Sequence, residues 1–309
     1  MGPTDPPPFP NHHERYYFND GSLVLQCEGV LYNVHPCLLS ARSALFQDML
    51  SLPQSGRNQQ PSELEPTAGS SNTHPVAITS TKADFDNLLL YIYDSYLQKN
   101  LSLEYLLSIL KMSHFYIIED GLQYAFNALE KHTGLTAQLR MHLALQYNHH
   151  QWIEPAFRGL ITRPANKFTL DDVAQIGTEA YFVVTHTQAR LDHLIRSMAC
   201  WPPTVLHGLS CDDQEACDEM WENAWWGGFA KQLFHPDRPA NLFDALETLH
   251  DIYIPGFNAV CKMKTLDELM EDSPLERVEV IIRAGIQALG GFRKSGEGGG
   301  SEASLEERV

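Results

Sequence analysis

Histidine and cysteine residues between positions 200 and 240 are the first candidates for chemistry in this 309-residue sequence. Imidazole nitrogen and thiolate sulfur are the ligands that structural zinc sites use. His207, Cys211, Cys217 and His235 are separated by three, five and 17 residues. These spacings match none of the usual paired-ligand motifs. The sequence therefore predicts no metal-binding residue and no cofactor.

Carboxylates and tryptophans follow in the same region. Acidic residues fill the stretch from Asp212 to Glu219, where the dipole of a helix favours them in its first turn, and this explains them more simply than acid–base catalysis does. Trp221, Trp225 and Phe229 recur at every fourth position, which is the pattern of a buried helix face. We expect these rings, together with that of Trp226, to form core, and ligand binding by the tryptophan cluster is the less favoured explanation. An enzyme with its site near 221–235 is the alternative.

Two short stretches resemble catalytic loops and fail on spacing. Residues 208–212 read Gly-Leu-Ser-Cys-Asp and lack the closing glycine of a nucleophile elbow. Residues 290–295 end in Lys-Ser, but no glycine precedes the lysine as a phosphate loop requires. His35 has no nucleophile beside it in the sequence, so we interpret it as a hydrogen-bonded structural histidine. No catalytic residue is predicted.

A β-hairpin and a pair of short helices organise the first 133 residues. Segments 22–27 and 30–35 are rich in β-branched and aromatic residues, and Glu28-Gly29 between them suits a two-residue turn. Behind them, 36–50 predicts two short helices, with Pro36 in the first turn and Ser43 capping the second. We expect the apolar face of the hairpin to cover these helices.

The rest of this part alternates polar segments with amphipathic ones. Residues 1–14 are proline-rich and predicted disordered, and 53–75 is predicted to be a flexible insertion. A strand at 74–79 and helices at 82–96, 102–115 and 119–132 follow, with Thr81 and Asp84 forming a capping box. One small sheet with these helices predicts a compact α+β domain over 15–133.

The second part, 134–292, is predicted to be an all-α domain, followed by a disordered tail at 293–309. Thr169 with Asp172 predicts a capping box, and Ser273-Pro274 with Glu276 predicts another helix start. The expected helices are 135–147, 152–161, 170–177, 179–198, 212–234, 242–252, 265–271 and 274–289.

Charge and composition exclude several classes of partner. The net charge is −17, and both halves are acidic, so direct nucleic-acid binding is disfavoured. No apolar run is long enough to cross a membrane. The six cysteines are scattered and no signal peptide is apparent, so we expect reduced thiols and an intracellular protein, cytoplasmic or nuclear.

The ordered motifs of residues 15–133 resemble the BTB/POZ domain. The series is a hairpin, the pattern HxxLLxxxSxxFxxML at 35–50, a strand and then helices. The sequence of residues 22–54 is most similar to the BTB proteins of mushroom-forming fungi. Many of those proteins carry a polar insertion at the position of 53–75 and a helical C-terminal half. The motif residues, which we take as candidate protein-interaction residues, are Leu23, Leu25, His35, Leu38, Leu39, Ser43, Phe46 and Met49.

The resemblance implies a non-catalytic protein-interaction module that acts as a scaffold or adaptor. Its expected contact surfaces are the hairpin edge and the helices of 36–50. Homodimers in the family commonly use an N-terminal helix and an aspartate where this chain has Ser22. Cullin-binding members commonly carry an apolar-x-Glu motif where this chain has Leu52-Pro53-Gln54. A homodimer, a cullin ubiquitin ligase adaptor and a regulator that reaches chromatin through a partner therefore stay open.

Overall fold

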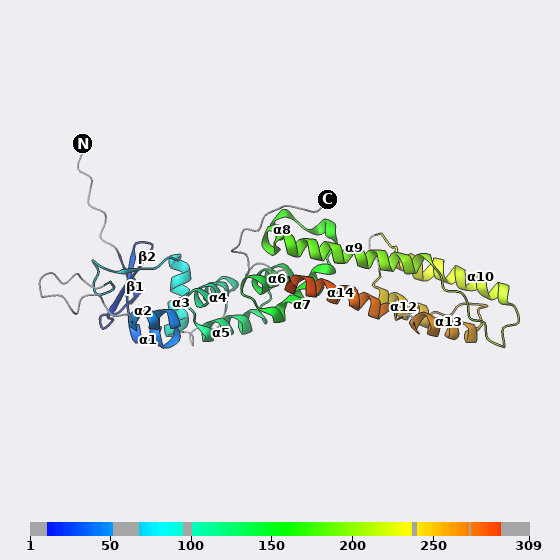
Figure 1. The fold of residues 1–309 in the computed structure, drawn as a ribbon, viewed down its shortest axis with the longest axis horizontal. Helices are drawn as coiled ribbons and strands as arrows, with labels where there is room; N and C mark the ends of the chain where they lie inside the picture. Colours follow the sequence, from blue (N-terminus) through cyan, green and yellow to red (C-terminus); the bar gives the residue numbers. More distant parts are fainter. Residues whose placement is uncertain (1–10, 52–67, 95–100, 237–239, 272, 292–309) are drawn as a thin grey trace, which may run out of the picture. The chain divides into compact units, whose positions relative to one another are not determined.

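The computed structural model describes residues 11–51, 68–94, 101–236, 240–271 and 273–291. The chain divides into two compact units, Met1–Thr136 and Ala137–Val309. The first unit contains the strands β1–β4 and the helices α1–α5, and the second unit is helical (Figure 1). We describe each unit by itself.

The described strands of the first unit form one sheet in the order β1-β3-β2-β4. β2 (Leu23–Cys27) and β3 (Val30–Val34) pair antiparallel, with Leu25 opposite Tyr32. Glu28 and Gly29 both have positive φ, 47° and 78°. This is the backbone of a two-residue turn whose twist matches that of the strands. The predicted hairpin and its turn are confirmed.

The strand β1 (Asn11–Tyr17) begins earlier than predicted. Residues 11–14 were expected to be disordered, but they form the first part of this strand. β1 runs parallel to β3, and Asn11 pairs with Val30. The ring of His12 stacks on Tyr17 at 3.9 Å, and the imidazole of His13 lies 3.2 Å from the Asp86 carboxylate. Tyr16 is the one buried side chain of this strand, so its sequence shows no hydrophobic alternation by which the strand could be predicted. Residues 1–10 lie outside the described residues.

The end of the predicted insertion also belongs to the sheet. The backbone N–H of Val24 donates to the carbonyl of Gly69 at 2.8 Å, and that of Gly69 donates to His74 at 2.6 Å. Gly69 has φ +83°, and a Cβ there would lie 2.7 Å from a Leu23 methyl group. Residues 68–75 therefore lie against β2, ahead of the short strand β4 (Val76–Ala77). The rest of the predicted insertion lies mostly outside the described residues.

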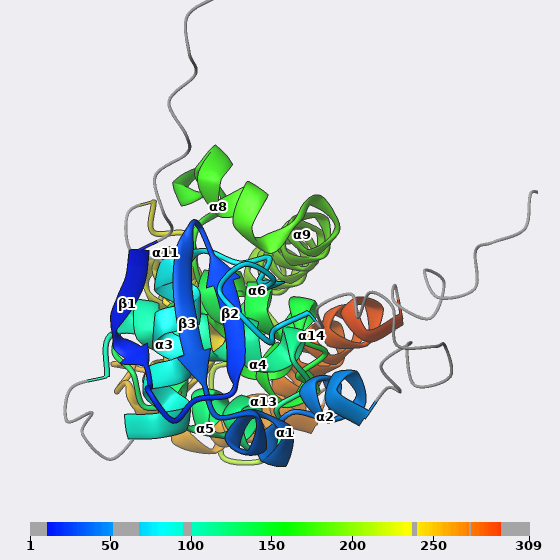
Figure 2. The same cartoon turned by 90° about the vertical axis from the view of Figure 1, so that its left-hand side faces the viewer.

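The helices of the first unit are α1 (Pro36–Arg42), α2 (Ala44–Ser51), α3 (Lys82–Asp94), α4 (Leu103–Phe115) and α5 (Glu119–Leu129). The sheet lies in front of α3 in Figure 2, and Tyr32 packs edge-on against Phe85 at 5.0 Å. β3 thus packs on α3. We had expected the hairpin to pack on the helices of 36–50. Val24 and Leu31 are buried as well, so both faces of the hairpin are covered.

The second unit is all-helical in its described residues, as predicted. Its long helix α9 packs on α7, α8, α11 and α14. The helices are α6 (Ala137–Gln146), α7 (Ile153–Ile161), α8 (Leu170–Ile176), α9 (Thr178–Cys200), α10 (Gln214–Ala224), α11 (Ala230–Leu233), α12 (Leu242–Asp251), α13 (Ala259–Glu271) and α14 (Pro274–Gly291).

Helix ends in this unit show one confirmed cap and three corrections. Thr169 and Asp172 form the predicted capping box. The helix expected over 212–234 is interrupted by a π-helical turn, Trp225–Phe229, which keeps both terminal rings buried. α13 begins at Ala259, six residues early, because the Asn258 side chain accepts from the backbone N–H of the second helical residue at 2.9 Å. α14 begins at Pro274, as predicted, but the Ser273 hydroxyl donates to the carbonyl of Glu271 at 3.4 Å and does not cap the helix.

Asp84 joins α3 to α4. Its carboxylate accepts a hydrogen bond from Ser108 at 2.8 Å and lies 2.6 Å from the Lys111 ammonium. Its backbone N–H donates to the Thr81 hydroxyl, as predicted for the cap. Burial opposes ionisation of Asp84, but the hydrogen bonds from Lys111, Ser108 and Thr81 outweigh it and lower the pKa of the carboxyl below 3.8.

We predict that Asp84→Asn destabilises the first unit by about 1–3 kcal/mol at neutral pH, because charged hydrogen bonds are lost. Since folding lowers this pKa, the stabilisation is present above the pKa of the unfolded chain and is lost as the pH falls through the folded value. The difference between wild type and variant should therefore shrink below about pH 4. Hydrogen exchange of peptides from α3 and α4 measures this difference in stability. Tryptophan fluorescence would not report on the first unit, because the five tryptophans all lie beyond residue 151. An equal difference at pH 7 and pH 2.5 would contradict the prediction, and Asp48→Asn on exposed α2 is the control.

Candidate protein-interaction surface

The structure places most of the predicted interaction residues inside the first unit. Leu23, Leu25, Leu39, Ser43 and Phe46 are buried. These five build the fold and cannot touch a partner in this conformation, because their side chains are already enclosed by their own domain. Among the others, Leu38 is exposed, and His35 and Met49 are half-buried. Of the predicted set, Leu38 alone is exposed, so a surface for partners needs further residues around the same helices.

His35 has the structural role that the sequence predicts. Its backbone N–H donates to the Tyr93 hydroxyl at 3.0 Å, and its ring Nδ1 lies 3.1 Å from the same oxygen. Its Nε2 lies 3.4 Å from the Asp20 carboxylate. Burial raises the pKa of Tyr93, so this hydroxyl keeps its proton and can donate to the imidazole. His35 thereby ties the end of β3 to α3.

Ser43 fastens the two short helices to the turn between α4 and α5. Its hydroxyl accepts from the backbone N–H of Phe46 at 3.1 Å, which confirms the predicted cap, and donates to the carbonyl of Tyr116 at 2.6 Å. Ser43 is only 1% exposed. The ring of Phe46 stacks on Tyr116 at 4.9 Å, and burial raises the pKa of that tyrosine to about 12. One enclosed hydroxyl thus joins segments that are 73 residues apart.

Two further bonds strengthen this junction. The backbone N–H of Ala44 donates to the carbonyl of Ile117 at 3.4 Å. The Arg42 guanidinium lies 3.0 Å from the Asp120 carboxylate on α5 and over the ring of Tyr91. α1, α2 and the α4–α5 turn therefore form one connected surface with a polar edge.

Four large apolar side chains are exposed on these bonded segments. Leu38 on α1 is 41% exposed and Leu45 on α2 is 39% exposed. Phe115 and Ile117 at the α4–α5 turn are 55% and 52% exposed. We call these four the apolar quartet. Exposed apolar groups that gather on one surface are typical of contact sites for other proteins.

Ile117 has a strained backbone. Its φ is +53°, in the left-handed region that β-branched residues rarely adopt. The neighbouring Ile118 is fully buried and its N–H donates to the carbonyl of Ser113 at 2.8 Å. The chain thus holds Ile117 outward and turns the next residue, Ile118, inward. Such strain concentrates at functional positions and is consistent with a contact role for Ile117.

Trp221 and Trp225 in the second unit are core residues, as predicted. Their indole N–H groups donate to the carbonyls of Pro203 at 2.9 Å and Ala199 at 2.8 Å. Both rings are buried, whereas Trp226 is 48% exposed. The alternative of an enzyme with its site in this region stays a prediction.

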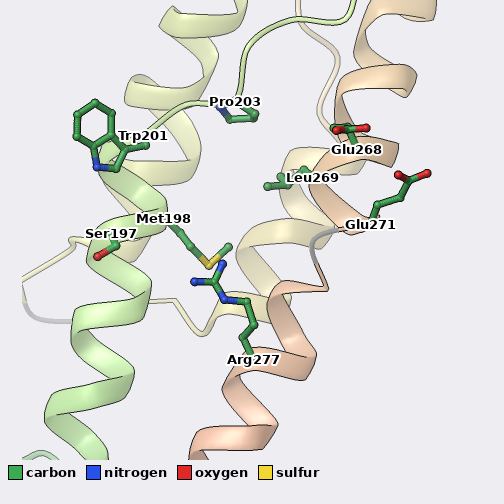
Figure 3. Close-up of a pocket in the computed structure, with 8 residues that line it drawn as sticks. All are labelled: Ser197, Met198, Trp201, Pro203, Glu268, Leu269, Glu271 and Arg277. Carbon is green, nitrogen blue, oxygen red and sulfur yellow. The ribbon is translucent and has the colours of Figure 1, made fainter.

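A hollow of about 540 Å³ lies between the end of α9 and the helices α13 and α14. Figure 3 shows Met198 and Arg277 directed toward each other across it, with Glu268 and Glu271 on α13. The exposed Trp201 borders it. These residue types define no reaction class, and we assign no activity to the hollow.

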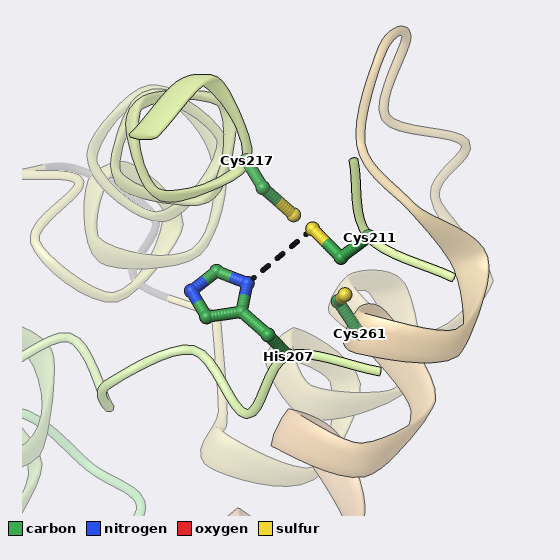
Figure 4. A group of neighbouring side chains, drawn as sticks. All are labelled: His207, Cys211, Cys217 and Cys261. Carbon is green, nitrogen blue, oxygen red and sulfur yellow. Dashed lines mark hydrogen bonds between the residues drawn. The ribbon is translucent and has the colours of Figure 1, made fainter. Parts of the chain in front are cut away.

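One group of potential metal ligands is brought together in the same unit. The ligand atoms of His207, Cys211, Cys217 and Cys261 all lie within 4.8 Å of one another (Figure 4). Cys261, and not His235, completes the group. Sequence spacing missed it because 43 residues separate Cys261 from Cys217, and such a distance carries no local motif.

The sheet, the helical hairpin and the buried motif residues of the first unit define a domain of the interaction class. The family model for the BTB/POZ domain matches residues 18–133. This part of the chain is a BTB/POZ domain, as the motif order predicts, and BTB/POZ domains are protein–protein interaction modules. No curated protein matches the chain. Among the described residues, no helix is both long and apolar enough to span a bilayer.

We predict that Ser43→Ala destabilises the first unit by about 1–3 kcal/mol, because it leaves a buried N–H and a buried carbonyl without their partner. Loss of exchange protection in α1, α2 and the α4–α5 turn measures the effect. Ser40→Ala is the matched control, since the Ser40 hydroxyl donates to Cys37 at 3.3 Å in an exposed position. Equal protection in the two variants would contradict the role of Ser43.

Proposed function

We propose that the protein is a scaffold whose BTB/POZ domain pairs with a second copy of itself through the apolar quartet. The observation that supports this is the exposure of Leu38, Leu45, Phe115 and Ile117 on segments that are hydrogen-bonded to one another. In a twofold pair both copies use the same surface, so each of these four side chains becomes buried in both copies. Complete burial of such a side chain contributes about 1.5–3 kcal/mol, and these four, which are about half exposed, would each contribute about half of that in each copy.

The surroundings of the quartet fit an interface. A contact surface between proteins has an apolar centre and a polar rim. Here the rim contains the half-exposed ion pair between Arg42 and Asp120. The buried hydroxyl of Ser43 fixes the backbone under the quartet, so little conformational entropy is lost when a partner docks. The helical unit would then be carried by the dimer as a second platform.

The role of cullin ubiquitin ligase adaptor stays a prediction. The position where cullin-binding relatives have an apolar-x-Glu motif is Leu52-Pro53-Gln54 in this chain, and it lies outside the described residues. A pull-down of the full chain with a cullin N-terminal domain tests that role independently of dimerisation.

We predict that the full chain sediments as a dimer at micromolar concentrations, and that Leu45→Asp and Ile117→Asn each raise the dimer dissociation constant at least tenfold. Tenfold corresponds to about 1.4 kcal/mol, which is about what burial of the exposed part of one such side chain contributes when it occurs in both copies. Both variants suit the local backbone, because aspartate is favoured in the first turn of a helix and asparagine tolerates positive φ. Sedimentation velocity over a concentration series measures the change.

Leu170→Asp is the matched control, since Leu170 is also exposed and also begins a helix, but lies in the other unit. It should leave the dissociation constant unchanged. A wild-type monomer at these concentrations would refute the homodimer, and a dimer insensitive to both variants would refute the quartet as its interface.

A further inference from the structure

The cluster of His207, Cys211, Cys217 and Cys261 comes from three separate segments of the second unit. His207 and Cys211 lie in the loop between α9 and α10, Cys217 lies in the first turns of α10, and Cys261 lies in the first turn of α13. Figure 4 shows the four side chains converging on one point. Three sulfurs and one imidazole that converge from separate segments are a recurrent ligand set for zinc.

The distances are close to those of a tetrahedral centre. Zinc binds sulfur at about 2.3 Å and nitrogen at about 2.0–2.1 Å, so tetrahedral angles place N and S about 3.6 Å apart and two S atoms about 3.8 Å apart. The Sγ of Cys211 lies 3.5 Å from Nδ1 of His207. All the other pairs of ligand atoms are within 4.8 Å. No pair of ligand atoms therefore exceeds its tetrahedral separation by more than about 1.2 Å.

The imidazole is oriented for this role by a neighbouring carboxylate. The Nε2 of His207 lies 3.3 Å from Oδ1 of Asp218, while Nδ1 faces the sulfurs. Metal-binding histidines commonly use their second nitrogen in this way, since the carboxylate fixes the ring and its tautomer. Asp218 follows Cys217 directly on α10, so one helix supplies both a ligand and the group that orients another.

A backbone N–H group is directed at one of the sulfurs as well. The N–H of Gly208 donates to the Sγ of Cys261 at 3.2 Å. Such donors stabilise the negative charge of thiolates. A Cβ at position 208 would lie 2.7 Å from a methyl group of Val260, so a side chain there would push the loop away from α13.

The cluster is enclosed, which favours a structural role. Cys261 and Cys217 are 0% and 3% exposed, and the side chain of His207 is 18% exposed. Four protein ligands leave no position for water or substrate, as in structural rather than catalytic zinc sites. A disulfide is the competing use of these thiols, but it would join only two sulfurs and would give no role to the alignment of His207 by Asp218.

We propose that His207, Cys211, Cys217 and Cys261 bind one zinc ion, which fastens the α9–α10 loop and the start of α13 to α10. The ion would add stability where the chain buries little, because only Val205 and Gly208 are buried in the loop from 201 to 213. Formation of the site would couple the folding of the second unit to metal. This proposal does not depend on the proposed dimer.

The first test is the metal content of the full chain purified without chelator, with the expected result of one zinc ion per chain by mass spectrometry of the metal. Replacement by cobalt(II) should give the intense visible bands and the sulfur charge-transfer band of a tetrahedral thiolate site. A chelator should lower the midpoint of thermal unfolding followed by tryptophan fluorescence, which reports only on the second unit. Chains with no bound zinc, or cobalt without tetrahedral bands, would overturn the proposal.

Variants assign the ligands. Cys211→Ser and His207→Asn change partly buried positions and should reduce bound metal at least tenfold, whereas Cys37→Ser and Cys200→Ser change exposed cysteines and should retain it. Asp218→Asn should weaken cobalt affinity about 10–100-fold, as expected for loss of a group that orients a ligand. Glu219→Gln is its control. Full zinc content in Cys211→Ser would overturn the ligand assignment.

Mass analysis after thiol alkylation separates the metal site from a disulfide. Six alkylated cysteines in the unfolded, metal-stripped chain without reductant support the zinc site. Four alkylated cysteines, with the missing pair among Cys211, Cys217 and Cys261, would replace the zinc site by a disulfide. Should Cys211→Ser fail to fold, the metal content and the cobalt spectrum of the wild-type chain still decide the question.

Discussion

The hydroxyl of Ser43 is the constraint on which the interaction surface depends. It is enclosed, caps α2 and bonds the carbonyl of Tyr116, so a single oxygen determines where two short helices lie on the end of α4. Helices of seven and eight residues are not stable alone. Their position therefore comes from this junction and from the stacking of Phe46 on Tyr116, and the exposure of Leu45 and Ile117 follows from it.

The two units use different means to hold their parts together. The BTB/POZ domain relies on the β2–β3 hairpin, which is covered on both faces, and on polar bridges such as those of His35 and Asp84. The helical unit relies on a core around Trp221 and Trp225, whose indole groups are bonded to backbone carbonyls. At the end of that core the apolar packing gives way to sulfur and imidazole, where a metal ion can take over the stabilisation of loops that bury little surface.

The motif by which a family is recognised is distinct from the surface that it presents. In this chain Leu25, Leu39 and Phe46 are recognisable because the fold needs them inside. The contact residues proposed here are less distinctive, since exposed leucine, isoleucine and phenylalanine occur singly on most proteins. Only their arrangement around one bonded junction makes them a candidate surface.

Sequence alone determined the hairpin turn at Glu28-Gly29, the cap at Ser43, the BTB/POZ assignment and the all-helical second part. These depend on neighbours in the chain, where propensity and periodicity act. Tertiary structure alone decided that polar β1 joins the sheet, that the apolar quartet lies around one junction, and that Cys261 meets His207. The reason is physical: pairing of polar strands, exposure of a side chain and convergence of ligands depend on contacts between segments distant in sequence, which leave no local period or spacing.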